Sequence, residues 1–107
     1  MKRSDVYWCR LEPVKGSEMG KTRPCVIVSL DSLNEVLPTV VVCPLTSIQR
    51  LKWRTRIPIT FEGRRADVCA EQIRVISKDR LVDRIGKLRL ADASALHDLL
   101  GEMYGST

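Results

Sequence analysis

Hydrophobic residues fall mostly into short runs separated by polar segments that contain glycine or proline. Asp5–Leu11 is rich in aromatic and β-branched residues, and Pro24–Ser29 and Thr39–Leu45 are nearly continuous apolar runs. Runs of this length and composition predict β-strands, and the last two read as buried strands. Pro44 cannot donate a hydrogen bond to a ladder, so we expect the third strand to stop or bulge there.

The second half of the chain predicts further strands. From Arg54 to Phe61 apolar and polar positions alternate, which predicts a strand with one apolar face and one cationic face. Ala66–Ile76 reads as one continuous strand, closed by the polar residues 77–79, and Arg84–Leu88 as a short final strand.

Helical signals are confined to two places. Ser32–Glu35 has the form of a capping box, which predicts a single helical turn ended by Pro38. Ala91–Met103 has leucines and a methionine at helical spacing, with Asp92 in the first turn, where the helix dipole favours an anion. Several short strands and one terminal helix, without βαβ alternation, predict a mainly β single domain over residues 1–107, a small antiparallel barrel with a C-terminal helix.

The charge of the chain is positive and unevenly distributed. Lysine and arginine total 18 against 13 acidic residues, which gives a net charge of +5. Residues 1–65 carry 12 basic and 6 acidic side chains, whereas residues 66–107 carry 6 and 7. A concentrated basic surface attracts polyanions, most commonly nucleic acid, although a merely soluble basic surface would have the same composition. A chain of 107 residues also buries a small share of its surface, which favours self-association.

The cysteines and the N-terminus indicate a reducing compartment. Each of the four cysteines lies in an apolar, strand-like stretch without C-x-x-C spacing, which predicts reduced core thiols: Cys9, Cys25, Cys43 and Cys69. His97, the single histidine, is far from them in sequence, so we expect neither a metal nor a cofactor. No apolar leader follows Met1 and no run is long enough to cross a bilayer, so we expect a cytoplasmic protein.

Arginine and hydroxyl groups are the candidates for chemistry. RNA can be cleaved without a metal when its own 2′-OH attacks the phosphate, provided that the protein stabilises the developing negative charge. Arg23 ends a connection of about a dozen residues, long for a hairpin loop, and its guanidinium could grip a phosphate or form a structural salt bridge. Thr46 and Ser47 follow a strand end and could bond the same phosphate or be ordinary turn residues. His97 belongs to the C-terminal helix, where we expect a solvated or half-buried histidine and no catalytic triad.

Four motifs in order resemble the MazF/PemK family of toxins. The N-terminal signature is carried by Asp5–Trp8 and Gly16–Ser29, the second motif by Pro44–Ser47, the third by Glu71–Arg74 and the fourth by Arg84–Leu88. Their order and approximate spacing match as well, so the resemblance covers nearly the whole chain.

The resemblance implies an SH3-like barrel, a homodimer, and sequence-specific cleavage of single-stranded RNA without a metal. It implies products with a 2′,3′-cyclic phosphate and a 5′-OH, with the family's catalytic arginine at Arg23 and its catalytic threonine at Thr46. It also implies a cognate, MazE-like antitoxin whose acidic and apolar side chains occupy the RNA groove.

The chain departs from the family pattern at three positions. Glu71 stands where the third motif usually has aspartate, Cys69 where some members have arginine, and Ser17 where some have histidine. Arginine is a poor general base because its pKa lies above about 12, so we assign Arg23 to charge stabilisation. Glu18 is a candidate base or a salt-bridge partner of Lys21.

RNA contacts are expected along the basic part of the chain. Beyond the catalytic pair we expect contacts from Ser17, Glu18, Lys21, Ser47, Trp53, Arg54, Arg56, Glu71 and Gln72. Trp53 is the candidate for stacking on a base, or else a barrel-edge core residue, and Trp8 reads as core. A track along the RNA backbone could use Arg50, Lys52, Arg54, Arg56, Arg64 and Arg65.

Two other classes of protein remain open. One is a non-catalytic barrel toxin that binds a protein target, similar to the gyrase-poisoning CcdB type, and the other is a passive SH3-like RNA-binding module. Neither needs Arg23 and Thr46 as a pair. The enzyme hypothesis therefore requires these two side chains to meet in one cleft.

Overall fold

The computed structural model describes residues 1–11, 16 and 21–105 of the chain, so Ser17 and Glu18 lie outside the described residues. In chain order the elements are β1 (Asp5–Arg10), β2 (Thr22–Ile27), α1 (Asp31–Val36), β3 (Thr39–Thr46), β4 (Arg56–Phe61), β5 (Arg64–Cys69), η1 (Ala70–Gln72), β6 (Arg74–Ser77), η2 (Lys78–Arg80), β7 (Leu81–Lys87) and α2 (Leu90–Tyr104).

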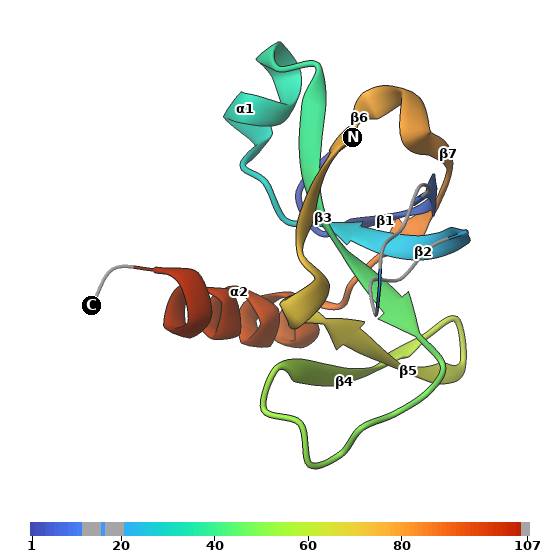
Figure 1. The fold of residues 1–107 in the computed structure, drawn as a ribbon, viewed down its shortest axis with the longest axis vertical. Coiled ribbons are helices and arrows are strands. Elements are labelled where there is room, and N and C mark those ends of the chain that lie inside the picture. Colours follow the sequence, from blue (N-terminus) through green and yellow to red (C-terminus); the bar gives the residue numbers. More distant parts are fainter. Residues whose placement is uncertain (12–15, 17–20, 106–107) are drawn as a thin grey trace.

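The strands form one curled antiparallel sheet. Its order is β4-β5-β3-β2-β1-β7, and β6 also pairs with β3. The sheet curls into a half-barrel, and α2 lies across its open side, next to β4 and η1 (Figure 1). The predicted class, a mainly β fold with a C-terminal helix, is confirmed.

β3 is the central strand, and it changes partner along its length. One edge pairs with β2, from Ile27 opposite Val42 to Cys25 opposite Pro44. The other edge pairs first with β6 and then with β5, and Pro44 lies in the gap between these two partners. Its missing N–H therefore interrupts no ladder on that edge. The strand continues to Thr46, whereas we expected it to stop or bulge at Pro44.

Two local predictions were wrong. Ala66–Ile76 is not one strand, because the 3-10 turn η1 breaks it where the sheet partner of β3 changes, and Ile73 N–H donates to Ala70 O at 3.3 Å. The turn α1 forms as predicted but without a capping box: Leu30 is the N-cap residue and no side chain caps the helix.

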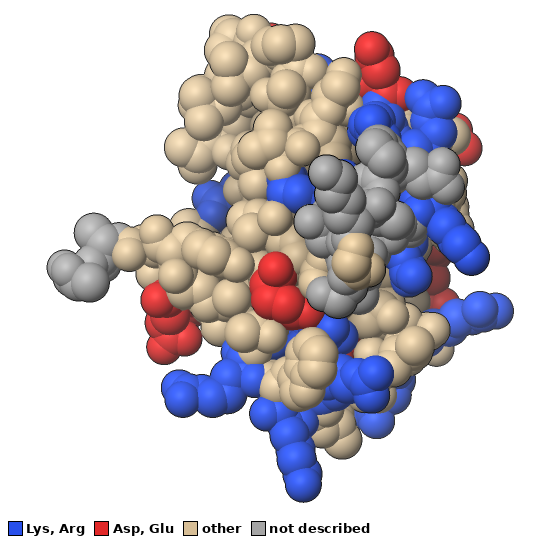
Figure 2. Space-filling model, in the orientation of Figure 1, with Lys and Arg blue, Asp and Glu red and all other residues tan. Residues whose placement is uncertain are grey.

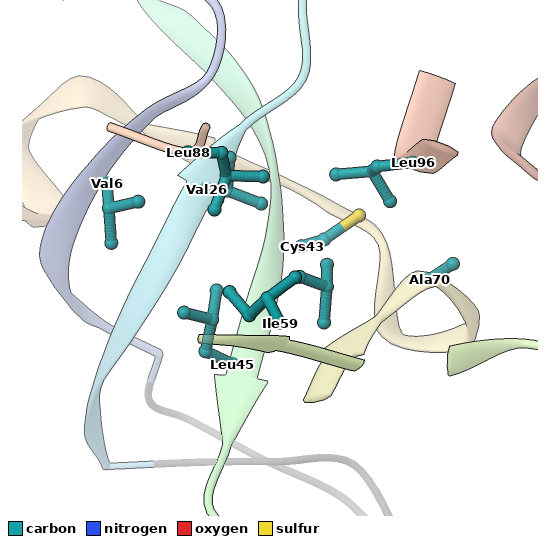
Figure 3. Close-up of a cluster of buried hydrophobic side chains, with 9 residues drawn as sticks. Val6, Val26, Cys43, Leu45, Ile59, Ala70, Leu88 and Leu96 are labelled. Carbon is teal, nitrogen blue, oxygen red and sulfur yellow. The ribbon is translucent and has the colours of Figure 1, made fainter. Parts of the chain in front are cut away.

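One of the two core clusters lies where the sheet meets α2 (Figure 3). Leu96 is buried against the sheet residues, and the other apolar residues of the predicted helix pack beside it: Leu99, Leu100 and Met103. At the end of α2, the Tyr104 hydroxyl donates to Ala70 O at 3.0 Å and ties the helix to η1. The helical periodicity thus identified the face that covers the half-barrel.

The four cysteines and His97 occupy the environments predicted for them. All four cysteines are buried and free. His97 is exposed on α2 and contacts Arg3. Within the described part of the chain no group of three histidine, cysteine or acidic side chains is placed to hold a metal. None of the helices described is long and apolar enough to span a membrane.

Candidate active site

Arg23 and Thr46 meet in one cleft. Arg23 is the second residue of β2, and Thr46 is the last residue of β3. Extending the pairing of Cys25 with Pro44 by two residues places Arg23 opposite Thr46 on the same face, since side chains alternate along antiparallel strands. Both residues line a cleft of about 760 Å³. The requirement set by the enzyme hypothesis is met.

Thr46 is held rigidly at the strand end. Its side chain is buried, with 6% of the residue exposed, and Thr46 Oγ1 accepts a hydrogen bond from Ile48 N–H at 3.2 Å. Arg23 is half-buried at the other wall of the cleft. It lies inside β2, whereas we expected it at the end of the preceding loop. Both groups are therefore positioned by paired strands, which hold side chains more precisely than loops do.

The rest of the cleft is basic and aromatic. Among the described residues, the cationic side chains on its walls are Arg23, Lys21, Arg64 and Arg65, and Glu62 is the acidic one. Ser47 also lines the cleft, as do the apolar residues Trp8, Pro24, Leu45, Phe61, Ala66 and Ile85. A concave basic surface of this kind raises the local concentration of a phosphate backbone.

Trp8 is the aromatic residue that the sequence interpretation misplaced. We expected it in the core, but it is 41% exposed and lines the cleft. In β1 the buried side chains are those of Val6 and Cys9. Trp8 lies opposite Pro24 of β2, the residue that follows Arg23. An aromatic residue in a strand next to a candidate phosphate-binding arginine was the available signal.

Most of the other predicted RNA contacts lie elsewhere. Lys21 and Ser47 line the cleft, whereas Trp53 and Arg54 are exposed on the loop between β3 and β4. Gln72 is half-buried in η1.

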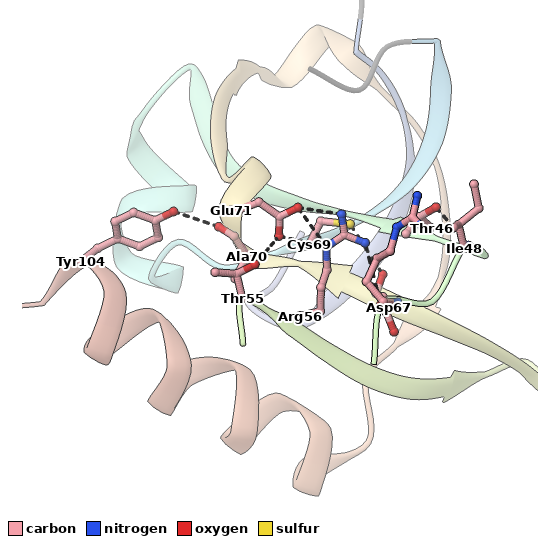
Figure 4. A network of polar contacts seen from close by, with 10 residues as sticks. Thr46, Ile48, Thr55, Arg56, Asp67, Cys69, Ala70, Glu71 and Tyr104 are labelled. Atoms are coloured by element: carbon pink, nitrogen blue, oxygen red, sulfur yellow. Dashed lines mark hydrogen bonds and ion pairs between the residues drawn. The ribbon is translucent and has the colours of Figure 1, made fainter. Parts of the chain in front are cut away.

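Arg56 and Glu71 bind each other. Arg56 Nε donates to both Glu71 oxygens, at 3.0 and 2.9 Å, and Arg56 Nη2 lies 2.7 Å from Glu71 Oε2 (Figure 4). The Arg56 side chain is only 7% exposed, so the predicted cationic face of this strand is not open at this residue. Partial burial opposes ionisation of Glu71, but the hydrogen bonds from Arg56 and from Thr55 outweigh it and hold the Glu71 pKa below its ordinary value.

Asp67 is a buried acid that the sequence interpretation did not select. It is 1% exposed, lies opposite Thr46 in the pairing of β3 with β5, and its Oδ2 accepts from Arg50 N–H at 2.8 Å. The same oxygen is 3.8 Å from Arg56 Nη1, while Oδ1 has no hydrogen-bond partner among the described residues. An acid within the apolar run 66–70 was the signal for it.

Positive charge is unevenly distributed on the face shown in Figure 2. Lysine and arginine side chains lie along the lower edge, where Figure 1 places β4 and β5, and along the right-hand edge, near β1, β2 and β7, while the region of α1 at the upper left carries little charge. A polyanion would therefore approach the half that contains the cleft.

The fold and the site together define a small antiparallel half-barrel protein with a basic, partly aromatic cleft. A family model described as the PemK-like, MazF-like toxin of type II toxin–antitoxin systems matches residues 2–104. The chain belongs to this family.

Named relatives and solved structures agree with this assignment. The endoribonuclease EndoA of Bacillus subtilis is 42% identical, over 82% of this chain and 80% of the relative. The MazF crystal structure from Deinococcus radiodurans superposes with a TM-score of 0.87 at 20% identity, over 99% of this chain and 97% of that one. A mycobacterial endoribonuclease solved in complex with its cognate antitoxin gives 0.83 at 25% identity, over 100% and 97%.

Proposed function

We propose that this protein is the toxin of a type II toxin–antitoxin pair and a sequence-specific endoribonuclease that cleaves single-stranded RNA without a metal. The observation that carries this proposal is the placement of Arg23 and Thr46 in one basic cleft of a chain that belongs to the toxin family. A gyrase-binding toxin or a passive RNA-binding module needs no such pair, so the cleft favours catalysis.

The reaction uses the nucleophile of the substrate itself. The 2′-OH next to the scissile phosphate gives up its proton and attacks phosphorus, and the bond to the 5′-oxygen of the next nucleotide breaks. That oxygen takes up a proton, so the products carry a 2′,3′-cyclic phosphate and a 5′-OH. Arg23 stabilises the negative charge that builds up on the phosphate, because a guanidinium forms paired, charge-assisted hydrogen bonds. Thr46 bonds the phosphate through its hydroxyl and fixes its orientation.

The RNA follows the basic walls of the cleft. Lys21, Arg64 and Arg65 neutralise neighbouring phosphates, and Ser47 adds a hydroxyl beside Thr46. Ser17 and Glu18, outside the described residues, are further candidate contacts. Trp53 and Arg54 extend the path onto the β3–β4 loop. Arg56 and Glu71 bind each other, so they contribute to RNA binding indirectly, by holding the β3–β4 loop in place.

Cleavage of a long mixed-sequence RNA in EDTA, followed by mapping of the new ends, tests this function. We expect discrete cuts with cyclic phosphate ends, and a loss of about 10²- to 10³-fold in rate for Arg23→Ala, the range seen when one charge-stabilising donor is removed. Lys87→Ala removes a positive charge from β7, outside the cleft lining, and serves as the matched control. RNA left intact by the wild-type protein would refute the proposal.

The cognate antitoxin is the expected regulator. Structures in this fold family include an endoribonuclease in complex with its antitoxin. An acidic and apolar antitoxin segment would match the basic and aromatic walls of the cleft and exclude RNA from it. Competition between the purified antitoxin and a fluorescent RNA oligonucleotide tests this, and simultaneous binding of both would contradict it.

Two further properties complete the proposal. The chain forms a homodimer, supported by large apolar side chains that are 43–74% exposed on α1, its flanks and β6: Leu30, Leu33, Val36, Leu37 and Val75. Light scattering should give twice the mass of the chain, and Val36→Asp should give a monomer if this face is the interface.

The protein acts in the cytoplasm, where its four free cysteines stay reduced and its RNA substrate is found.

A further inference from the structure

Trp53 is a large aromatic side chain that the fold leaves open. It is 48% exposed on the β3–β4 loop, residues 47–55, and it does not line the cleft. The guanidinium carbon of Arg56 lies 4.5 Å from the centroid of its ring, and that of the exposed Arg50 lies 5.7 Å away. The indole therefore contacts a largely buried cation, Arg56, and has part of its surface exposed to solvent.

The cation beneath the ring is fixed. Arg56 uses Nε and Nη2 to hold Glu71, with distances of 2.7 to 3.0 Å, and its Nη1 faces Asp67 at 3.8 Å. Two carboxylates thus compensate its charge, and Glu71 occupies its Nε and Nη2. What remains available at this position is the aromatic ring and not the guanidinium.

The loop that carries Trp53 is also anchored. Arg50 N–H donates to the buried Asp67 at 2.8 Å, and Trp53 N–H donates to Arg50 O at 2.9 Å. At the other end of the loop, the Thr55 hydroxyl donates to Glu71 at 3.0 Å. The same two acids that hold Arg56 therefore hold the loop, so that stacking on Trp53 needs little further ordering of the protein.

We propose that Trp53 is a stacking platform for one unpaired nucleobase of the RNA, away from the scissile phosphate, and that Arg56, clamped by Glu71, is the positioning residue that orients the ring. This inference rests on the proposed ribonuclease function. Unpaired RNA bases stack on exposed aromatic side chains, and the neighbouring exposed cations Arg50, Lys52 and Arg54 suit the flanking phosphates. An acidic peptide would gain little from Arg56, whose Nε and Nη2 are already bound to Glu71.

The platform is linked to the catalytic strand end. Asp67, which anchors Arg50, lies opposite Thr46 in the β3–β5 pairing, and the loop begins directly after Thr46. A base seated on Trp53 would therefore contribute to binding and to the register of the RNA along the cleft. The bond-breaking step itself would depend little on Trp53.

Steady-state cleavage of the mapped RNA site separates binding from chemistry. We expect Trp53→Ala to raise KM by about 5- to 100-fold, the range for loss of one base–aromatic stack, with kcat at saturating RNA within about threefold of wild type. Trp53→Phe should restore most of the loss because a planar ring remains. Leu51→Ala, which truncates an 83% exposed side chain in the same loop, should change neither constant.

Fluorescence provides the readout that a purely structural role would not move. In a Trp8→Phe background Trp53 is the sole tryptophan, and binding of a non-cleavable 2′-O-methyl copy of the RNA should quench its emission. Moving 2-aminopurine along that RNA should give quenching at one position, lost in Trp53→Ala. Arg56→Met should weaken the quenching and raise KM while circular dichroism shows the native fold, and Arg56→Lys should lie between.

Three outcomes would overturn the inference while leaving the ribonuclease function intact. These are an unchanged KM in Trp53→Ala, a loss of kcat alone, or an equal defect in Trp53→Phe. By contrast, a wild-type protein that cleaves no RNA would refute the function itself.

Discussion

Substitution of Glu71 by glutamine tests the ion pair that supports the β3–β4 loop. Glutamine keeps the shape of the side chain and can still accept from Thr55, but it removes the charge that lies 2.7 Å from Arg56 Nη2. Arg56 would then keep a buried charge with only Asp67, at 3.8 Å, to compensate it.

The expected cost follows from the burial of the two partners. Breaking a fully buried ion pair by removing one partner costs about 3–5 kcal/mol. The Glu71 side chain is 22% exposed and Asp67 remains, so we expect a cost below this range, about 2–3 kcal/mol of unfolding free energy. For a domain of this size that corresponds to a fall in Tm of about 8–20 °C.

The assay is thermal and urea unfolding of wild type, Glu71→Gln, Arg56→Met and the double variant at one protein concentration, because the stability of the proposed dimer would depend on concentration. The pH dependence has a defined sign. The folded pKa of Glu71 is lowered, so its contribution is present above the unfolded value of about 4.3 and is lost as pH falls through the folded pKa. The unfolding free energy of Glu71→Gln should lack the part of the pH dependence that comes from ionisation of Glu71.

Two results would refute the reasoning about this pair. One is a Glu71→Gln protein within about 0.5 kcal/mol of wild type, the scatter expected for an ordinary surface substitution. The other is an equal loss in the Arg56→Met background, because a true pair must show coupling between its two partners.

Three further predictions concern the cleft and the core. Thr46→Val, which removes the hydroxyl but keeps the shape, should lower kcat by about 10²-fold in the RNA cleavage assay, whereas Thr46→Ser should keep most activity. Gly86→Ala would bring a Cβ to 3.2 Å from the Phe61 ring, which lines the cleft, so we expect a loss of about 1 kcal/mol in urea unfolding and a raised KM. Burial raises the pKa of Cys43 and of Cys69 to about 12, so a thiol reagent at pH 8 should label neither in the native protein and all four cysteines in urea.

The class of fold could be predicted because it depends on local patterns. Continuous apolar runs identified β2 and β3 to within two residues, and leucines at helical spacing identified α2. Such patterns record which side of an element faces the core, and this is a property of the element itself. Arg23 and Thr46 could be selected because motif order along the chain resembles a known family.

The tertiary structure alone decided which polar groups meet. Arg56 reads as one of several loop and strand cations, and Glu71 as a motif residue, yet folding buries them against each other across 15 residues of sequence. Asp67 and Trp8 were misjudged or overlooked for the same reason: their neighbours belong to other strands. The period of a sequence fixes which face a residue occupies, but the partner on that face is set by the pairing and curl of the sheet, and only the folded chain brings those partners together.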